Sequence, residues 1–220
     1  MTTATAIGPL ESGRWNRASG ILTEVVGLRC MARISPLPST ELGALNEALN
    51  AMVAANGYAP NSLPTMARVP GLAEAFGAIA KSVMGNPNLP GPLLQMVAHI
   101  ASTTAGCRYC AAHTAHNAEH MGVSEAKLAD LWVWETSEHF DDAERAALRL
   151  AFHSASVPNT VTDELIAELR GHYDDDQIAG LVAVISLFGF LNRWNDTMST
   201  DLEDQPNEFA EAVLSAQGWS

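Results

Sequence analysis

The most apolar stretch of the chain runs from Ile178 to Leu191, fourteen residues interrupted only by Ser186. A helix that crosses a bilayer needs about 20 apolar residues, so a stretch of this length predicts a buried helix of a folded domain. A helix that is apolar on nearly every side must be covered on every side. The cover has to come from other parts of the chain or from a neighbouring subunit, and this requirement favours a helical protein assembled around residues 178–191.

Helix start and stop signals divide most of the remaining chain, and strand signals are scarce. Ser39 or Thr40 can cap a first helix, and Asp141 with Glu144 predicts an approximate capping box. These signals predict an all-α fold with a single domain over residues 39–220, preceded by an N-terminal arm over residues 1–38. We expect helices over residues 39–55, 70–84, 92–104, 107–121, 124–136, 141–153, 162–170, 174–191 and 206–216.

The middle of the chain carries the residues with the most distinctive chemistry. Residues 106–114 read Gly-Cys-Arg-Tyr-Cys-Ala-Ala-His-Thr, so Cys107 and Cys110 have the Cys-x-x-Cys spacing. The preceding helix is expected to end at Ala105-Gly106, and the next to begin at Cys107. Gly106 permits a tight corner between the two helices. The two cysteines are therefore predicted to lie in the first turn of a helix.

That position favours thiolate chemistry. The first amides of a helix have no partners within it and the helix dipole is positive there, so a thiolate is stabilised relative to a thiol. Cys107 and Cys110 lie one turn apart, close enough for a disulfide to form with modest adjustment. His113 falls within about 120° of both cysteines on the helical wheel, where it could act as a base or proton carrier. The pattern predicts a dithiol redox site.

The same segment resembles the alkylhydroperoxidase D-like group of the carboxymuconolactone decarboxylase family. Members carry Gly-Cys-x-x-Cys followed by a histidine on a helix, and residues 61–66 (Asn-Ser-Leu-Pro-Thr-Met) and 187–198 also resemble the family. The resemblance spans about residues 40–205. It implies an AhpD-like bundle of helices, a thiol-dependent alkyl hydroperoxidase of the peroxiredoxin type, and a homo-oligomer, a trimer or a multiple of it.

The resemblance also implies roles for individual residues. Cys110 would attack the peroxide, Cys107 would resolve the sulfenic acid as a disulfide, and His113 would relay protons. Two positions depart from the family pattern: His113 follows the second cysteine by three residues instead of four, and Gln95 stands where a glutamate is expected. His99, one turn after Gln95, is a candidate substitute for the glutamate, as are Glu119 and Glu135.

Other side chains near the motif have two possible roles. Tyr109 could line the pocket or pack its ring against a neighbouring helix. His116 and His120 are expected on the helix surface. Asn192-Arg193-Trp194-Asn195-Asp196 follows the apolar stretch. We interpret it as a polar helix end stabilised by a cation near the C-terminus, and the alternative is that it completes the pocket from a neighbouring subunit.

Composition limits the compartment and the partners. The 220 residues include 12 Lys and Arg against 25 Asp and Glu, a formal charge of −13, which argues against nucleic acid and anionic membranes as partners. Three cysteines do not form a disulfide framework, and the third, Cys30, is expected to be buried. We expect no secretion signal, because the first residues lack a basic start and an apolar core. We therefore expect a cytoplasmic protein, and the family resemblance implies an enzyme that needs no cofactor, with a peroxide as substrate and a dithiol or thioredoxin-like protein as reductant.

Several alternatives stay open at this point. Cys107, Cys110, His113 and His116 or His120 are the ligand types that zinc prefers, although a second distant pair is absent. The protein could instead be a thiol–disulfide exchange protein or reductase with little peroxidase activity, or a cofactor-free lactone decarboxylase. From a different class, it could be a redox-responsive module without enzymatic activity, whose oligomeric state follows the dithiol.

Overall fold

The computed structural model describes residues 32–219, and within this range the chain is helical, without strands. The all-α prediction is confirmed for these residues. The arm predicted over residues 1–38 and the buried position predicted for Cys30 lie wholly or mostly outside the described residues. The α-helices are α1 (Ala44–Asn56), α2 (Ser62–Met66), α3 (Leu72–Met84), α4 (Gly91–Thr104), α5 (Arg108–His120), α6 (Glu125–Ala129), α7 (Asp142–Ala155), α8 (Asp163–Leu169), α9 (Asp175–Met198) and α10 (Asp204–Val213), with 3₁₀ turns η1 (Ser39–Glu41), η2 (Leu131–Val133) and η3 (Ser215–Gln217).

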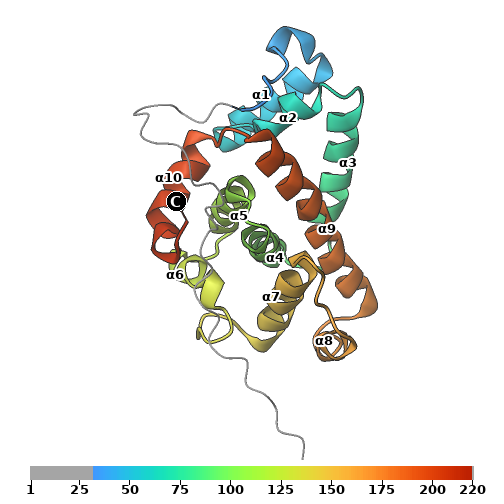
Figure 1. Cartoon of the computed structure of the whole chain (residues 1–220), viewed down its shortest axis with the longest axis vertical. Helices are drawn as coiled ribbons and strands as arrows, with labels where there is room; N and C mark the ends of the chain where they lie inside the picture. Colours follow the sequence, from blue (N-terminus) through green and yellow to red (C-terminus); the bar gives the residue numbers. More distant parts are fainter. Residues whose placement is uncertain (1–31, 220) are drawn as a thin grey trace, which may run out of the picture.

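The helices α4 and α5 lie in the middle of the molecule, and the others are arranged around them (Figure 1). α4 packs against α5, α7 and α9, while α5 also contacts α9 and α10. Most side chains of α4 are buried, including Leu94, Val97 and Ile100. The burial of this helix on all sides makes the α4–α5 pair the framework on which the cysteine motif is held.

Local signals in the sequence account for most helix ends. Asp141 and Glu144 form a complete capping box at α7, as predicted. Asp174 and Gln177 form a second capping box, at α9, and the hydrogen bonds of this box fix where the long helix begins. Thr162 caps α8 through its side chain.

Two predicted helices are shorter than expected. The helix predicted over residues 39–55 is interrupted at Gly43, whose φ of +53° lies outside the helical region, so the regular helix begins only at Ala44. The helix predicted over residues 124–136 ends at Ala129 and continues as a 3₁₀ turn. There, Trp132 and Trp134 pack edge-on against each other and both contact Phe152 of α7, so tertiary packing overrides the local helical preference.

The long helix α9 is the one that contains the apolar stretch. Among residues 32–219 it is the helix with the length and composition to cross a membrane, but it packs against α3, α4, α5 and α7, as the core helix of a folded domain does. Its buried side chains include Leu181, Val184 and Leu187. Val182 and Phe190 are 40% and 39% exposed, so this protomer alone does not cover α9 on every side.

Candidate active site

Cys107 is the residue that caps the start of α5. Its backbone is extended, and its Sγ accepts a hydrogen bond from the backbone N–H of Cys110 at 3.5 Å. Gly106 adopts a φ of +78°, which is the tight corner that the sequence predicted. The Cys107 sulfur therefore lies at the positive end of the helix dipole, in direct contact with an amide that has no partner within the helix.

The surroundings shift the pKa values of the two thiols in opposite directions. Hydrogen bonds from the Cys110 thiol and from the backbone N–H groups of Cys110 and Tyr109 lower the pKa of Cys107, against the opposing effects of burial and the Asp196 carboxylate. Burial raises the pKa of Cys110 well above its usual value, and the adjacent Cys107 sulfur adds to this, whereas a hydrogen bond from Asn195 acts in the other direction. Cys107 is therefore the sulfur that more readily ionises.

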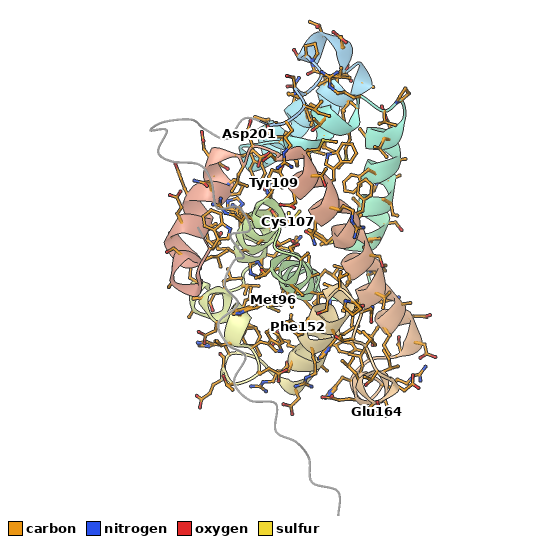
Figure 2. All side chains as sticks on the ribbon, viewed as in Figure 1. Met96, Cys107, Tyr109, Phe152, Glu164 and Asp201 are labelled. Carbon is orange, nitrogen blue, oxygen red and sulfur yellow. The ribbon has the colours of Figure 1, made fainter. Side chains whose placement is uncertain are left out.

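A cavity of about 980 Å³ opens beside Cys107. Four parts of the chain form its wall: the loop between α1 and α2, the start of α5, the end of α9 with the following loop, and the first turn of α10. Figure 2 shows Cys107, Tyr109 and Asp201 in the same region of the molecule, and all three line the cavity. Cys110 and His113 lie behind this wall. Cys107 lines the cavity, so a small molecule in the cavity would lie next to this residue, although only 1% of Cys107 is exposed.

A proton-holding cluster lies next to the cysteines. His113 Nε2 is 2.7 Å from Glu203 Oε2, an ion-pair contact in which the N–H direction is not well aligned with the oxygen. His113 Nδ1 donates to the Tyr109 carbonyl at 2.9 Å, and the Tyr109 hydroxyl donates to Glu203 Oε1 at 2.8 Å. Because both ring nitrogens of His113 face oxygen acceptors, one additional proton shared between His113 and Glu203 satisfies the arrangement.

Glu203 is held as a carboxylate despite its burial. Burial raises the pKa of Glu203, but His113, the backbone N–H of Asn61 at 2.5 Å and the Tyr109 hydroxyl outweigh it, so the pKa lies below its usual value. Glu203 and Tyr109 both line the cavity. Glu203 and Tyr109 therefore connect the cluster to the cavity, whereas His113 contacts Glu203 but does not line the cavity.

Sequence reasoning missed Glu203. It precedes α10 and is separated from Tyr109 by 94 positions, so no spacing rule connects it to the cysteine motif. It does supply what the sequence left open, a glutamate within reach of His113. Asn195 was interpreted as part of a polar helix end, but its Nδ2 donates to Cys110 Sγ at 3.4 Å. The end of α9 thus contributes to the site from within the same chain.

Gln95 and His99, the suggested substitutes for a helix glutamate, lie elsewhere. His99 Nδ1 donates to the Ala111 carbonyl at 3.0 Å, and Thr103 and Thr114 approach the same ring at 3.3 Å, so the imidazole connects α4 to α5. Gln95 lies one turn earlier on α4, and its buried Oε1 has no partner among residues 32–219. Neither residue lies on the cavity wall.

The buried His99 should make folding stability dependent on pH. Burial lowers the pKa of His99 from 6.5 to about 4, against the opposing effect of the Ala111 carbonyl. The unfolded chain therefore takes up a proton near pH 6.5 that the folded chain takes up only near pH 4, so stability is full above pH 6.5 and is lost as the pH falls towards 4. We expect wild type to lose about 2–3 kcal/mol more than His99→Asn between pH 7 and 4.5, measured by urea unfolding.

The matched control is His172→Asn, since His172 is exposed. It should keep the pH dependence of wild type. An identical pH dependence in wild type and His99→Asn would contradict this assignment.

His116 and His120 continue along the same helix. Their ring centroids are 4.2 Å apart, and His116 is buried, not on the surface as predicted. Burial lowers the pKa of His116, and His120 and His113 add to the effect.

In the described part of the chain, no three His, Cys, Asp or Glu side chains are gathered closely enough to hold a metal ion.

Comparisons with known sequences give two results. The sequence model of the carboxymuconolactone decarboxylase family matches residues 70–153, a segment that contains both cysteines and His113 but neither Asn195 nor Glu203. The Bacillus subtilis (strain 168) protein YdfG is 34% identical over 91 residues, which are 41% of this chain and 60% of YdfG. The chain thus spans somewhat less than two thirds of that relative.

Solved structures extend the similarity over most of the chain. The debrominase Bmp8, a cysteine-to-alanine variant in complex with 2,3,4-tribromopyrrole, is 31% identical with a TM-score of 0.77, over 83% of this chain and 100% of Bmp8. A peroxidase-related protein from Ralstonia eutropha JMP134, with an alkylhydroperoxidase AhpD core, has a TM-score of 0.75 over 83% of this chain and 97% of its own. At 19% identity, that second likeness concerns the fold.

Proposed function

We propose that this chain, which belongs to the carboxymuconolactone decarboxylase family, is a dithiol enzyme that reduces hydroperoxides. The observation that carries the proposal is the Cys107 sulfur at the start of α5, which lies on the cavity wall with its pKa lowered. A thiolate is the nucleophile in peroxide reduction, so the sulfur that ionises first and meets the cavity is the one that attacks.

In the first step, the Cys107 thiolate attacks one oxygen of the hydroperoxide. An S–O bond forms and the O–O bond breaks, so the cysteine is oxidised to a sulfenic acid and the substrate is reduced to an alcohol. The departing alkoxide needs one proton. The cluster of Tyr109, Glu203 and His113 holds one, and it meets the cavity through Tyr109 and Glu203.

In the second step, Cys110 condenses with the sulfenic acid. Its sulfur forms the disulfide with Cys107, and the sulfenic oxygen leaves as water together with the Cys110 proton. Asn195 donates to the Cys110 sulfur and so favours its ionised form against the effect of burial. An external dithiol or a thioredoxin-like protein then reduces the disulfide. This order of the two thiols is the reverse of the one that the resemblance implied.

The proposal predicts a fixed stoichiometry. The reduced protein, mixed anaerobically with an alkyl hydroperoxide, should consume one equivalent and lose two thiols, with the disulfide between Cys107 and Cys110 located by peptide mapping. Reduction of one O–O bond takes two electrons in total, which the dithiol supplies as it becomes a disulfide. Thiol titration and alcohol product analysis measure the result. Unchanged thiols after prolonged exposure would exclude hydroperoxides as the substrate.

Reductive debromination is the second candidate. The likeness to Bmp8 favours it, since Bmp8 is matched over its whole length. The same dithiol could supply two electrons, replacing a carbon–bromine bond by carbon–hydrogen and releasing bromide as the disulfide forms. Bromide release from a brominated pyrrole, compared with hydroperoxide consumption by the same preparation, separates the two candidates.

We also propose that the enzyme is a homo-oligomer. The partly exposed Val182 and Phe190 of α9 lie on the helix that this protomer does not fully cover, and Phe190 stacks on Phe76 of α3 at 5.7 Å. A second copy could cover these apolar side chains. Light scattering coupled to size exclusion measures the subunit number, and a monomer at micromolar concentration would contradict the proposal.

A further inference from the structure

The wall of the Cys107 cavity carries an unequal distribution of charge. Among the described residues, its wall includes the carboxylates of Asp196, Asp201 and Glu203 and the guanidinium of Arg108. We infer that the cavity takes uncharged or cationic electrophiles that offer an O–H or N–H donor, and repels anionic ones. This inference rests on the proposed function, because it names the class of substrate that the Cys107 thiol reduces.

The negative charge is present at the reacting sulfur itself. The Asp196 carboxylate, on the last turns of α9, is close enough to raise the pKa of Cys107, which the hydrogen bonds around that sulfur outweigh. Asp201 lies in the loop after α9, where its Oδ2 accepts from the backbone N–H of Ala32 at 3.5 Å, and this bond leaves the charge in place. An anion that approaches Cys107 through the cavity therefore meets like charges on the cavity wall.

Among the described residues, the basic side chains near the cavity offset the charge of these carboxylates only in part. His113 is matched by Glu203. The Arg108 guanidinium lies 4.6 Å from the centre of the Trp219 ring, a contact that draws it towards the C-terminal segment. Arg33 donates to the carbonyls of Asp196 and Thr197 at the end of α9, but it does not line the cavity. The first turn of α10 points its positive end at the cavity, where its own Glu203 and Asp204 offset it.

A second feature of the wall indicates what a ligand should offer. Asn195 is 2% exposed and lines the cavity, and while its Nδ2 donates to Cys110, its Oδ1 has no partner among residues 32–219. A buried carbonyl oxygen without a partner costs free energy that a donor from a ligand can recover. A hydroperoxide O–H, an N–H or a cationic group fits this acceptor, and a carboxylate does not.

Alkylation of Cys107 tests the inference without requiring turnover. Iodoacetamide is uncharged with an N–H donor, and iodoacetate is an anion of nearly the same size. Trypsin cuts after Arg108, so Cys107 and Cys110 fall in different peptides and mass spectrometry follows each separately. In the reduced full-length protein we expect the ratio of the two rates at Cys107 to favour iodoacetamide about fivefold more than in the urea-unfolded chain.

Charge-removing variants identify the source of the preference. Asp196→Asn and Asp201→Asn should each bring the ratio towards that of the unfolded chain, and raising the ionic strength should do the same for wild type. Glu164→Gln removes the same charge from exposed α8, at the far end of the molecule from Asp201 (Figure 2), and should leave the ratio unchanged.

The outcomes separate this inference from the proposed function. A ratio equal to that of the unfolded chain, failure of both reagents to reach Cys107, or an equal effect of Glu164→Gln and the cavity variants would each overturn the inference. A preserved preference for iodoacetamide in a protein that reduces no hydroperoxide would overturn the proposed function and leave the charge selection of the cavity intact.

Discussion

Replacing Cys107 with serine should abolish hydroperoxide reduction, lowering kcat/KM by about 10³-fold or more. A serine hydroxyl ionises far less readily than a thiol, and the amide at the start of α5 cannot compensate for the difference. The serine oxygen can still cap the helix, so the fold should persist. Steady-state hydroperoxide consumption with an excess of dithiol measures the effect.

Cys110→Ser is the informative comparison. It removes the resolving sulfur but leaves the attacking one, so it should consume one equivalent of hydroperoxide in a single turnover and accumulate a sulfenic acid at Cys107. Dimedone labelling followed by peptide mapping detects this product. If the label were found at Cys110 in Cys107→Ser and not at Cys107 in Cys110→Ser, the order of attack would be the one that the family resemblance implied.

Replacing Glu203 with glutamine should lower kcat by about 10²-fold, the scale of one acid–base group. The amide keeps an acceptor for the Asn61 N–H and the Tyr109 hydroxyl, but it removes the charge that pairs with His113 at 2.7 Å. The cluster would then hold its proton less well, so the loss should appear in kcat more than in KM. Stopped-flow oxidation at several pH values measures it.

The same variant has a defined effect on stability. Because the pKa of Glu203 lies below its usual value, its pairing stabilises the fold above that usual value and is lost as the pH falls through the lower folded pKa. Wild type should therefore be more stable than Glu203→Gln at pH 7, and the difference should shrink in acid. Glu208→Gln, on the exposed side of α10, is the control. Equal turnover of Glu203→Gln and Glu208→Gln would contradict the assignment.

Local signals were sufficient to place the two cysteines of the motif. A glycine before a Cys-x-x-Cys at a helix start places both cysteines without knowledge of the remaining fold, and Gly106 and Cys107 adopt the predicted conformations. The difference between the two thiols was not accessible in this way. It depends on which sulfur meets the cavity and on donors such as Asn195, which come from α9.

Contacts between distant segments account for what sequence reasoning missed. Glu203 reaches His113 because α10 packs against α5, and the matched family segment ends fifty residues earlier, at position 153. Similarly, the helix predicted over residues 124–136 ends at Ala129 because Trp132 and Trp134 pack against Phe152. In both cases tertiary packing decided the outcome, and a single sequence carries no direct record of it.

The cap that Cys107 provides for α5 links helix order to the redox potential. As a thiolate, the sulfur accepts the Cys110 N–H, but in a disulfide it is uncharged and a weak acceptor. Each oxidation therefore gives up a helix cap, about 1 kcal/mol, and each reduction restores it. A stabilised reduced form makes a disulfide easier to reduce, by roughly 20 mV for that free energy. In the proposed cycle, the start of one helix would thus help to return the protein to its reduced state.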